Sequence, residues 1–92
     1  MGFFSIRKPN VSLVEFHEKV RVELANKGFD ERKRNKVEMF FHGDLSESRD
    51  EDRGIDRSEI SNGIKWLREN SSKHDFSDND ISLIEESLLK NV

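Results

Sequence analysis

The stretch IDRSEI, residues 55–60, contains the start signals of a helix, and the stretch FSDNDI, residues 76–81, repeats them. Asp56 and Ser77 are suitable N-cap residues, and each is followed three positions later by an acid, which is the spacing of a capping box. An apolar residue on either side of each box can form a hydrophobic staple, as in the pairs Ile55/Ile60 and Phe76/Ile81. The sequence therefore predicts helices at residues 57–70 and 78–90, and their shared capping chemistry explains the likeness without an internal repeat.

Apolar residues continue from both starts at helical spacing, which predicts that each helix buries one face. The two sets are Ile60, Ile64 and Leu67 in the first helix, and Ile81, Ile84 and Leu88 in the second.

Two further helices are predicted upstream, at residues 11–27 and 30–42. The first has a capping box at Ser12 and Glu15 and a glycine stop at Gly28, and the second has Asp30 as its N-cap and Gly43 as its stop. Their apolar stripes are Leu13, Phe16, Val20 and Leu24 in the first, and Val37, Phe40 and Phe41 in the second. Short strands at residues 3–6 or 36–41 stay open, because neither stretch alternates cleanly.

The expected fold is all-α, a single small four-helix domain over residues 1–92 in an orthogonal or bundle-like arrangement. A mobile acidic loop at about residues 43–55 separates the second helix from the third, and residues 1–9 form a tail that need not be ordered.

Composition narrows the possible functions. The 92 residues carry a net charge of -3, are 33% hydrophobic and 38% charged, and have a mean hydropathy of -0.84, which indicates a thin core under long charged side chains. No cysteine is present, so a disulfide framework and a thiolate nucleophile are excluded. No apolar run is long enough to span a membrane, and the first residues match neither a secretory signal nor a myristoylation pattern, so we expect no membrane association and a cytoplasmic location.

Residues 48–59, SRDEDRGIDRSE, resemble the calcium-binding loop of EF-hand proteins over roughly twenty residues that include the following helix. The resemblance implies a bound calcium ion whose ligands come from loop positions 1, 3, 5, 7, 9 and 12. Those positions are Ser48, Asp50, Asp52, Gly54, Asp56 and Glu59.

Three features depart from that pattern. Ser48 replaces the usual first aspartate, Arg53 replaces the glycine of the sharp turn, and Gly43 interrupts the entering helix. The capping box and staple already explain Asp56 and Glu59. We therefore favour an acidic turn that needs no cofactor and keep calcium binding as the alternative.

Nucleic-acid binding is a further alternative, through a helix-turn-helix-like element. The helix at 57–70 could present polar side chains to DNA bases, and the basic run at 32–36 could contact phosphates. The base-reading candidates are Arg57, Ser58, Asn62 and Lys65, and the phosphate contacts are Arg32 and Arg34. The acidic loop before that helix would repel phosphates, so nucleic acid is not the favoured partner.

Catalysis is not expected, because no nucleophile elbow or glycine-rich phosphate loop is present and His17, His42 and His74 lack ligand spacing. Several apolar residues instead lie off the main stripes: Val14, Val22, Met39, Trp66 and Leu83. For Val14 and Val22, the favoured explanation is that the first helix is buried on both sides. The alternative is that these apolar residues form an exposed patch that binds a partner or a second copy of the chain.

The leading function is therefore a non-enzymatic protein-interaction module of the regulator, adaptor or inhibitor type. Trp66 is its central residue, because tryptophan is enriched at binding hot spots. Acidic charge around an apolar strip would favour a basic protein partner.

Overall fold

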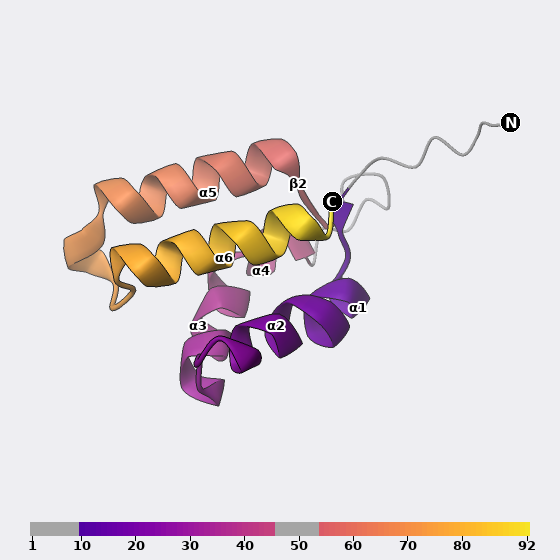
Figure 1. Cartoon of the computed structure of the whole chain (residues 1–92). Coiled ribbons are helices and arrows are strands. Elements are labelled where there is room, and N and C mark those ends of the chain that lie inside the picture. The colour runs from indigo at the N-terminus through magenta and orange to yellow at the C-terminus, as the bar shows by residue number, and fades with distance from the viewer. Residues whose placement is uncertain (1–9, 46–53) are drawn as a thin grey trace, which may run out of the picture.

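The third and fourth predicted helices form a hairpin along one side of the molecule. The structure, a computed structural model, describes residues 10–45 and 54–92. The hairpin consists of α5 (Arg57–Glu69) and α6 (Asp78–Lys90), linked through the single turn η3 (Ser71–Lys73). Figure 1 shows the two helices side by side and running in opposite directions, so the chain reverses within the link between them.

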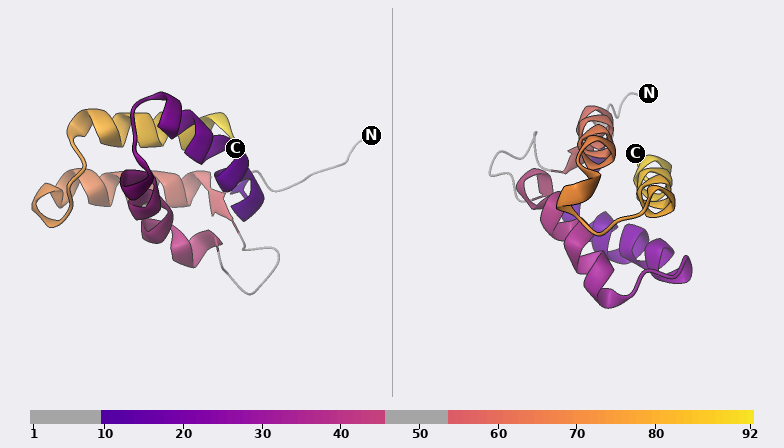
Figure 2. Two further views of the ribbon diagram at one scale, coloured as in Figure 1. Left: turned by 90° about the horizontal axis from the view of Figure 1, so that it is seen from below. Right: turned by 90° about the vertical axis from the view of Figure 1, so that its left-hand side faces the viewer.

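The remaining helices pack against this hairpin from below. They are the continuous segment α1 (Leu13–Glu15), η1 (Phe16–Val20) and α2 (Arg21–Asn26), then α3 (Glu31–Phe40) and the short α4 (His42–Leu45). Figure 2 shows α3 crossing the hairpin at a steep angle. The expected all-α class and its four helices are confirmed, and a very small sheet is added to them.

The capping boxes predicted at Asp56 and Ser77 are present at the starts of α5 and α6. The Glu59 amide donates to Asp56 Oδ1 at 2.8 Å, and the Asp56 amide donates back to Glu59 Oε1 at 2.9 Å. Ser77 and Asp80 exchange the equivalent bonds at 3.0 and 3.1 Å. Each box satisfies amides that a helix start leaves without an intrahelical partner.

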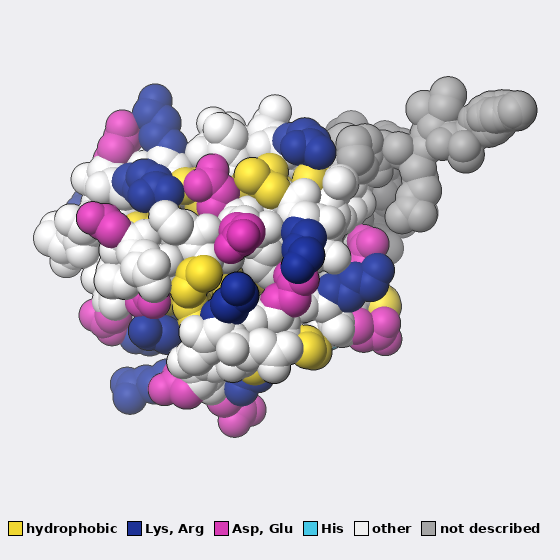
Figure 3. Space-filling view, viewed as in Figure 1, with side chains coloured by type: hydrophobic (Ala, Val, Ile, Leu, Met, Phe, Trp, Pro, Cys, Tyr) yellow, Lys and Arg dark blue, Asp and Glu magenta, His cyan; other side chains and the backbone are white. Residues whose placement is uncertain are grey.

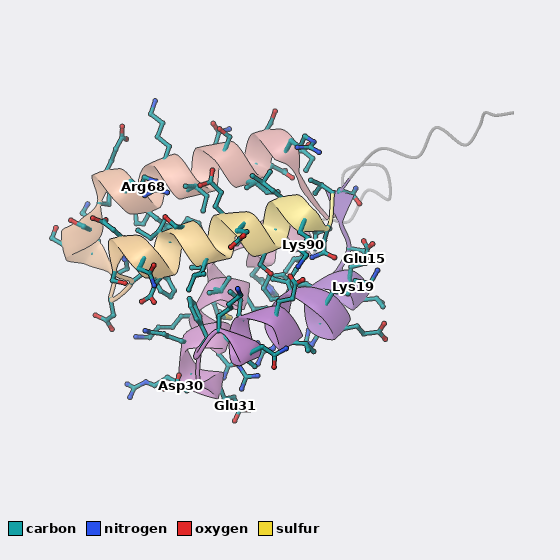
Figure 4. The ribbon with its side chains drawn as sticks, in the orientation of Figure 1. Glu15, Lys19, Asp30, Glu31, Arg68 and Lys90 are labelled. Carbon is teal, nitrogen blue, oxygen red and sulfur yellow. The ribbon has the colours of Figure 1, made fainter. Side chains whose placement is uncertain are left out.

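The first helical segment also begins and ends as the sequence predicts. Ser12 and Glu15 form its capping box, and Gly28 follows it with a φ of 101°. The Gly28 amide bonds to Ala25 O at 3.1 Å and the Phe29 amide to Leu24 O at 2.9 Å, which is the pattern of a Schellman motif. Asp30, labelled in Figure 4, then caps α3.

The middle of this segment is a π-helix, which the sequence analysis did not predict. Phe16, Val20 and Leu24 are four residues apart and all fully buried. In a regular α-helix such residues drift by about 40° per step around the axis, and the wider π turn reduces that drift. Leu13, which the prediction placed on the same stripe, is instead exposed.

The end of α3 corrects the prediction that Gly43 stops the second helix. The helix ends at Phe40, and Gly43 lies inside α4 with no positive φ. Phe41 and Leu45 are both buried, and the Leu45 amide bonds to Phe41 O at 3.1 Å. The chain thus turns at Phe41, between α3 and α4, and both of these side chains stay in the core.

A two-residue antiparallel sheet ties the start of the described chain to the start of α5. Strand β1 (Asn10–Val11) pairs with β2 (Ile55–Asp56), with Val11 opposite Ile55. Val11 thus belongs to a strand and not to the first helix, and residues 36–41 form no strand because they lie within α3 and its end. The other suggested strand, at residues 3–6, lies outside the described residues, as does most of the predicted acidic loop.

The core lies where the hairpin meets the other helices. Its members include the predicted stripes of α5 and α6, both staples, and Phe16, Val20, Leu24, Phe29, Val37, Phe41 and Leu45. On the face drawn in Figure 3, acidic and basic side chains are interspersed over the surface. Within residues 10–45 and 54–92, no helix is both long and apolar enough to cross a lipid bilayer.

Gly54 gives a test of the sheet. Its φ is 108°, and a Cβ there would lie 2.9 Å from Val11 O and from Asn10 Cγ. Gly54→Ala should therefore lower the free energy of unfolding by about 2–4 kcal/mol in urea denaturation, through backbone strain and overpacking together.

Gly28→Ala is the matched control, because Gly28 has a similar φ of 101° but nothing within 4 Å of its Cβ position. Strain alone should cost about 1–2 kcal/mol there. Equal losses for the two variants would show that the close approach to β1 is not present in solution.

Candidate binding groove

A groove lies between α3 and the link that joins α5 to α6. Its volume is about 640 Å³. One side of α3 contributes residues at helical spacing, α5 contributes two, and the link contributes five. They are Arg32, Asn35, Lys36, Met39 and Phe40; then Trp66 and Leu67; then Ser72, Lys73, His74, Asp75 and Phe76. Segments far apart in sequence thus build one concave surface, the form in which ligand sites usually occur.

A row of aromatic rings runs through the groove. Phe40 contacts Phe41 edge-on with centroids 4.9 Å apart, and it packs on Trp66 at 5.6 Å. Trp66 continues to His74 at 6.3 Å, and His74 to Phe76 at 5.5 Å. These separations lie in the range of favourable aromatic pairs, so the row connects α3, α5 and the start of α6.

His74 is fixed by both of its ring nitrogens. Nε2 lies 2.6 Å from the Leu67 carbonyl oxygen, and the Phe76 amide donates to Nδ1 at 3.1 Å. In this arrangement Nε2 faces an acceptor and Nδ1 faces a donor, because a carbonyl can only accept and an amide N–H can only donate. His74 therefore holds the link in place and has no nitrogen left for a ligand.

Three of the apolar side chains that line the groove are exposed to solvent, whereas Leu67 and Phe76 are buried. Met39 is 69% exposed, Trp66 42% and Phe40 37%. The sequence singled out Met39 and Trp66, and the structure brings them into one groove. The sequence analysis placed both Phe40 and Phe41 on the buried edge of their helix. Adjacent residues lie about 100° apart around a helix, so the two cannot point in the same direction. Phe41 occupies the buried position, so Phe40 is left at the surface.

The other three candidate partner-binding residues lie elsewhere. Leu83 is partly buried and lines a separate hollow of about 300 Å³ between α2 and α6. Val14 and Val22 are 61% and 51% exposed on the first helical segment. The expectation that this segment is buried on both sides is therefore wrong, because these two side chains of its outer face are exposed.

Polar contacts between the two helices line the hollow around Leu83. Ser87 Oγ donates to Glu23 Oε1 at 2.7 Å, and Lys90, labelled in Figure 4, lies 3.0 Å from Glu23 Oε2. The Ser87 hydrogen bond is the main cause that lowers the pKa of Glu23, against the opposing effect of burial. These groups satisfy one another, which indicates a structural contact between α2 and α6.

Bases outnumber acids at the rim of the main groove. The charged lining residues are Arg32, Lys36 and Lys73 against the single acid Asp75. Lys36 Nζ lies 2.6 Å from Asp75 Oδ2, and this hydrogen bond, followed by the lysine charge, lowers the pKa of Asp75. The acidic surroundings that the sequence suggested for Trp66 are thus not found among the residues that line its groove.

The candidate calcium ligands are only partly described. Ser48, Asp50 and Asp52 lie outside the described residues. Asp56 and Glu59 form their capping box, and Gly54 packs beside β1. Among residues 10–45 and 54–92, no three His, Cys, Asp or Glu side chains are grouped to hold a metal ion. Calcium binding by the whole 48–59 loop stays a prediction.

The candidate base-reading residues on α5 are Arg57, Ser58, Asn62 and Lys65, and all four are exposed. Exposure alone does not distinguish them, because many polar residues of this chain are exposed. Arg34 bends back, and its Nε donates to Asp30 O at 3.2 Å.

No protein-family model, curated protein or solved structure was found to match the chain. The geometry of the groove is therefore the main guide to function.

The ion pair at the rim gives a prediction. Lys36→Gln should raise the pKa of Asp75 toward the ordinary aspartate range, because the hydrogen bond and the charge that favour the carboxylate are removed. An NMR titration of the aspartate carboxyl carbons would measure it. Since folding lowers this pKa, the contribution of the pair to stability is present above the unfolded pKa and is lost as the pH falls through the folded one.

Lys33→Gln is the control. Lys33 Nζ lies 2.9 Å from Asp80 Oδ2, and although burial opposes ionisation there, the lysine hydrogen bond helps to lower the pKa of Asp80. This variant should raise the pKa of Asp80 and leave Asp75 unchanged. If the pKa of Asp75 is the same in the Lys36→Gln variant as in the original chain, the ion pair between Lys36 and Asp75 is not formed in solution.

Proposed function

We propose that this chain is a non-enzymatic protein-interaction module, of the regulator, adaptor or inhibitor type, that binds another protein through the groove around Trp66. The observation that carries the proposal is the exposure of Met39, Phe40 and Trp66 together in one concave surface. Large apolar side chains usually avoid such exposure when they are this close together. A partner segment would insert a large apolar side chain between Met39 and Trp66.

The two central residues suit this role for different reasons. Trp66 contacts the rings of Phe40 and His74, so less side-chain freedom would be lost on binding. Tryptophan also concentrates binding energy at interfaces. Met39 is unbranched and flexible, so it can adapt to the shape of the incoming side chain.

The groove offers little to support catalysis. Both nitrogens of His74 are engaged, and the carboxylate of Asp75 is paired with Lys36 and open to solvent. Catalytic acids and bases usually sit where burial shifts their pKa toward neutrality. A non-enzymatic role in the cytoplasm, as expected from the sequence, is part of the proposal.

A displayed library of random peptides, selected on the immobilised chain, would test this function. Peptides that bind should lose about 30-fold in affinity on Trp66→Ala, the loss typical of a hot-spot residue. Circular dichroism would check that the variant keeps its helices. Val22→Ala is the control, because Val22 is also an exposed apolar residue but lies away from the groove.

Two results would argue against the proposal. Peptides that bind the Trp66→Ala variant as well as the original chain would place binding elsewhere. Sedimentation equilibrium that shows a dimer, lost on Trp66→Ala, would mean that a second copy of the chain occupies the groove instead of another protein.

A further inference from the structure

The positive charge at the groove is unusual for this chain, which has 19 acids and 16 bases. Some bases in the described ranges are paired with acids, as Arg21 is with Glu38 at 2.9 Å and Lys33 with Asp80 at 2.9 Å. Arg32 and Lys73 line the groove and form no ion pair with any residue in the described ranges, although the charge of Arg32 helps to lower the pKa of Asp75. An acidic chain thus presents a locally basic rim around Trp66, which is the most exposed Phe or Trp side chain in the described ranges.

The third base, Lys36, has only a weakly held partner. Its side chain is 41% exposed and that of Asp75 is 77% exposed. Ion pairs this open to water contribute little, because solvent screens them and both side chains lose freedom. A carboxylate from another molecule could replace Asp75 at Lys36 and leave Asp75 hydrated.

We propose that the groove selects acidic protein segments, in which an Asp or Glu lies next to the apolar side chain that enters beside Trp66. The apolar anchor would contact Met39 and Trp66, and the carboxylate would take the place of Asp75 on Lys36, supported by the nearby Arg32 and Lys73. This inference rests on the proposed function. Asp75 then acts as a built-in competitor that lowers the affinity for such segments.

The ring contacts favour a peptide over a single-stranded nucleic acid, which would also be attracted to a basic, aromatic groove. Nucleic-acid binding of that kind requires open ring faces on which successive bases can stack. Trp66 already packs against Phe40 and His74 at centroid distances of 5.6 and 6.3 Å. The chain as a whole is also acidic, which disfavours a phosphate backbone.

The peptide selection described above tests the inference through the sequences it yields. Peptides that depend on Trp66 should be enriched in Asp or Glu within a few positions of an aromatic or branched apolar residue. For the tightest such peptide, measured by isothermal titration at low ionic strength, Asp75→Asn should strengthen binding roughly two- to fivefold, because it frees Lys36. Lys36→Glu should weaken binding by at least as much.

Glu86→Gln and Lys65→Glu are the controls, since they make the same charge changes at exposed positions outside the groove. They should alter the affinity much less than the groove variants. Similar effects from both pairs would show that only the net charge matters and would overturn the inference.

The remaining outcomes separate the two proposals. Peptides that need Trp66 but carry no acids would leave the interaction module standing and overturn its acidic selectivity. The absence of any peptide that depends on Trp66 would overturn the module itself. Binding of an oligothymidylate that is lost on Lys36→Glu would assign the groove to nucleic acid instead.

Discussion

The close approach of two phenylalanines to Gly63 determines where α3 meets α5, and the groove follows from that contact. A Cβ at Gly63 would lie 2.9 Å from Phe41 Cε1 and 3.1 Å from Phe40 Cε2, which is closer than normal packing allows. The missing side chain lets Phe41 enter the core while Phe40 lies over α5 and reaches Trp66. A larger residue at this position would push the two rings away and disturb the packing of Phe40 on Trp66.

The same contact explains why the groove is both open and well ordered. Phe40 and Phe41 are adjacent at the end of α3 and lie about 100° apart around the helix, so Phe41 is buried and Phe40 is left at the surface. On the opposite side, His74 bonds to the Leu67 carbonyl and to the Phe76 amide, which fixes the link before α6. Exposed apolar residues held between two anchored walls need little rearrangement to bind a partner.

Local signals in the sequence predicted much of the fold. The capping boxes at Ser12, Asp56 and Ser77 and the glycine stop at Gly28 depend on a few neighbouring residues, and all are present. Strand β1, the turn at Phe41 and the groove depend on contacts between distant segments. Trp66 and Met39 could be recognised as apolar residues off their stripes, but no spacing in the sequence shows that they share one groove or that Lys36 and Lys73 surround it.

An NMR spectrum that records nuclear Overhauser effects between nearby protons would test this account most directly. We expect cross-peaks from the Gly63 α protons to the Phe41 ring, and from the Trp66 indole to the rings of both Phe40 and His74. Those contacts together define the groove from α3 to the link before α6. An indole with cross-peaks only to residues of its own helix would show that the two walls do not meet, and the proposed binding surface would not exist.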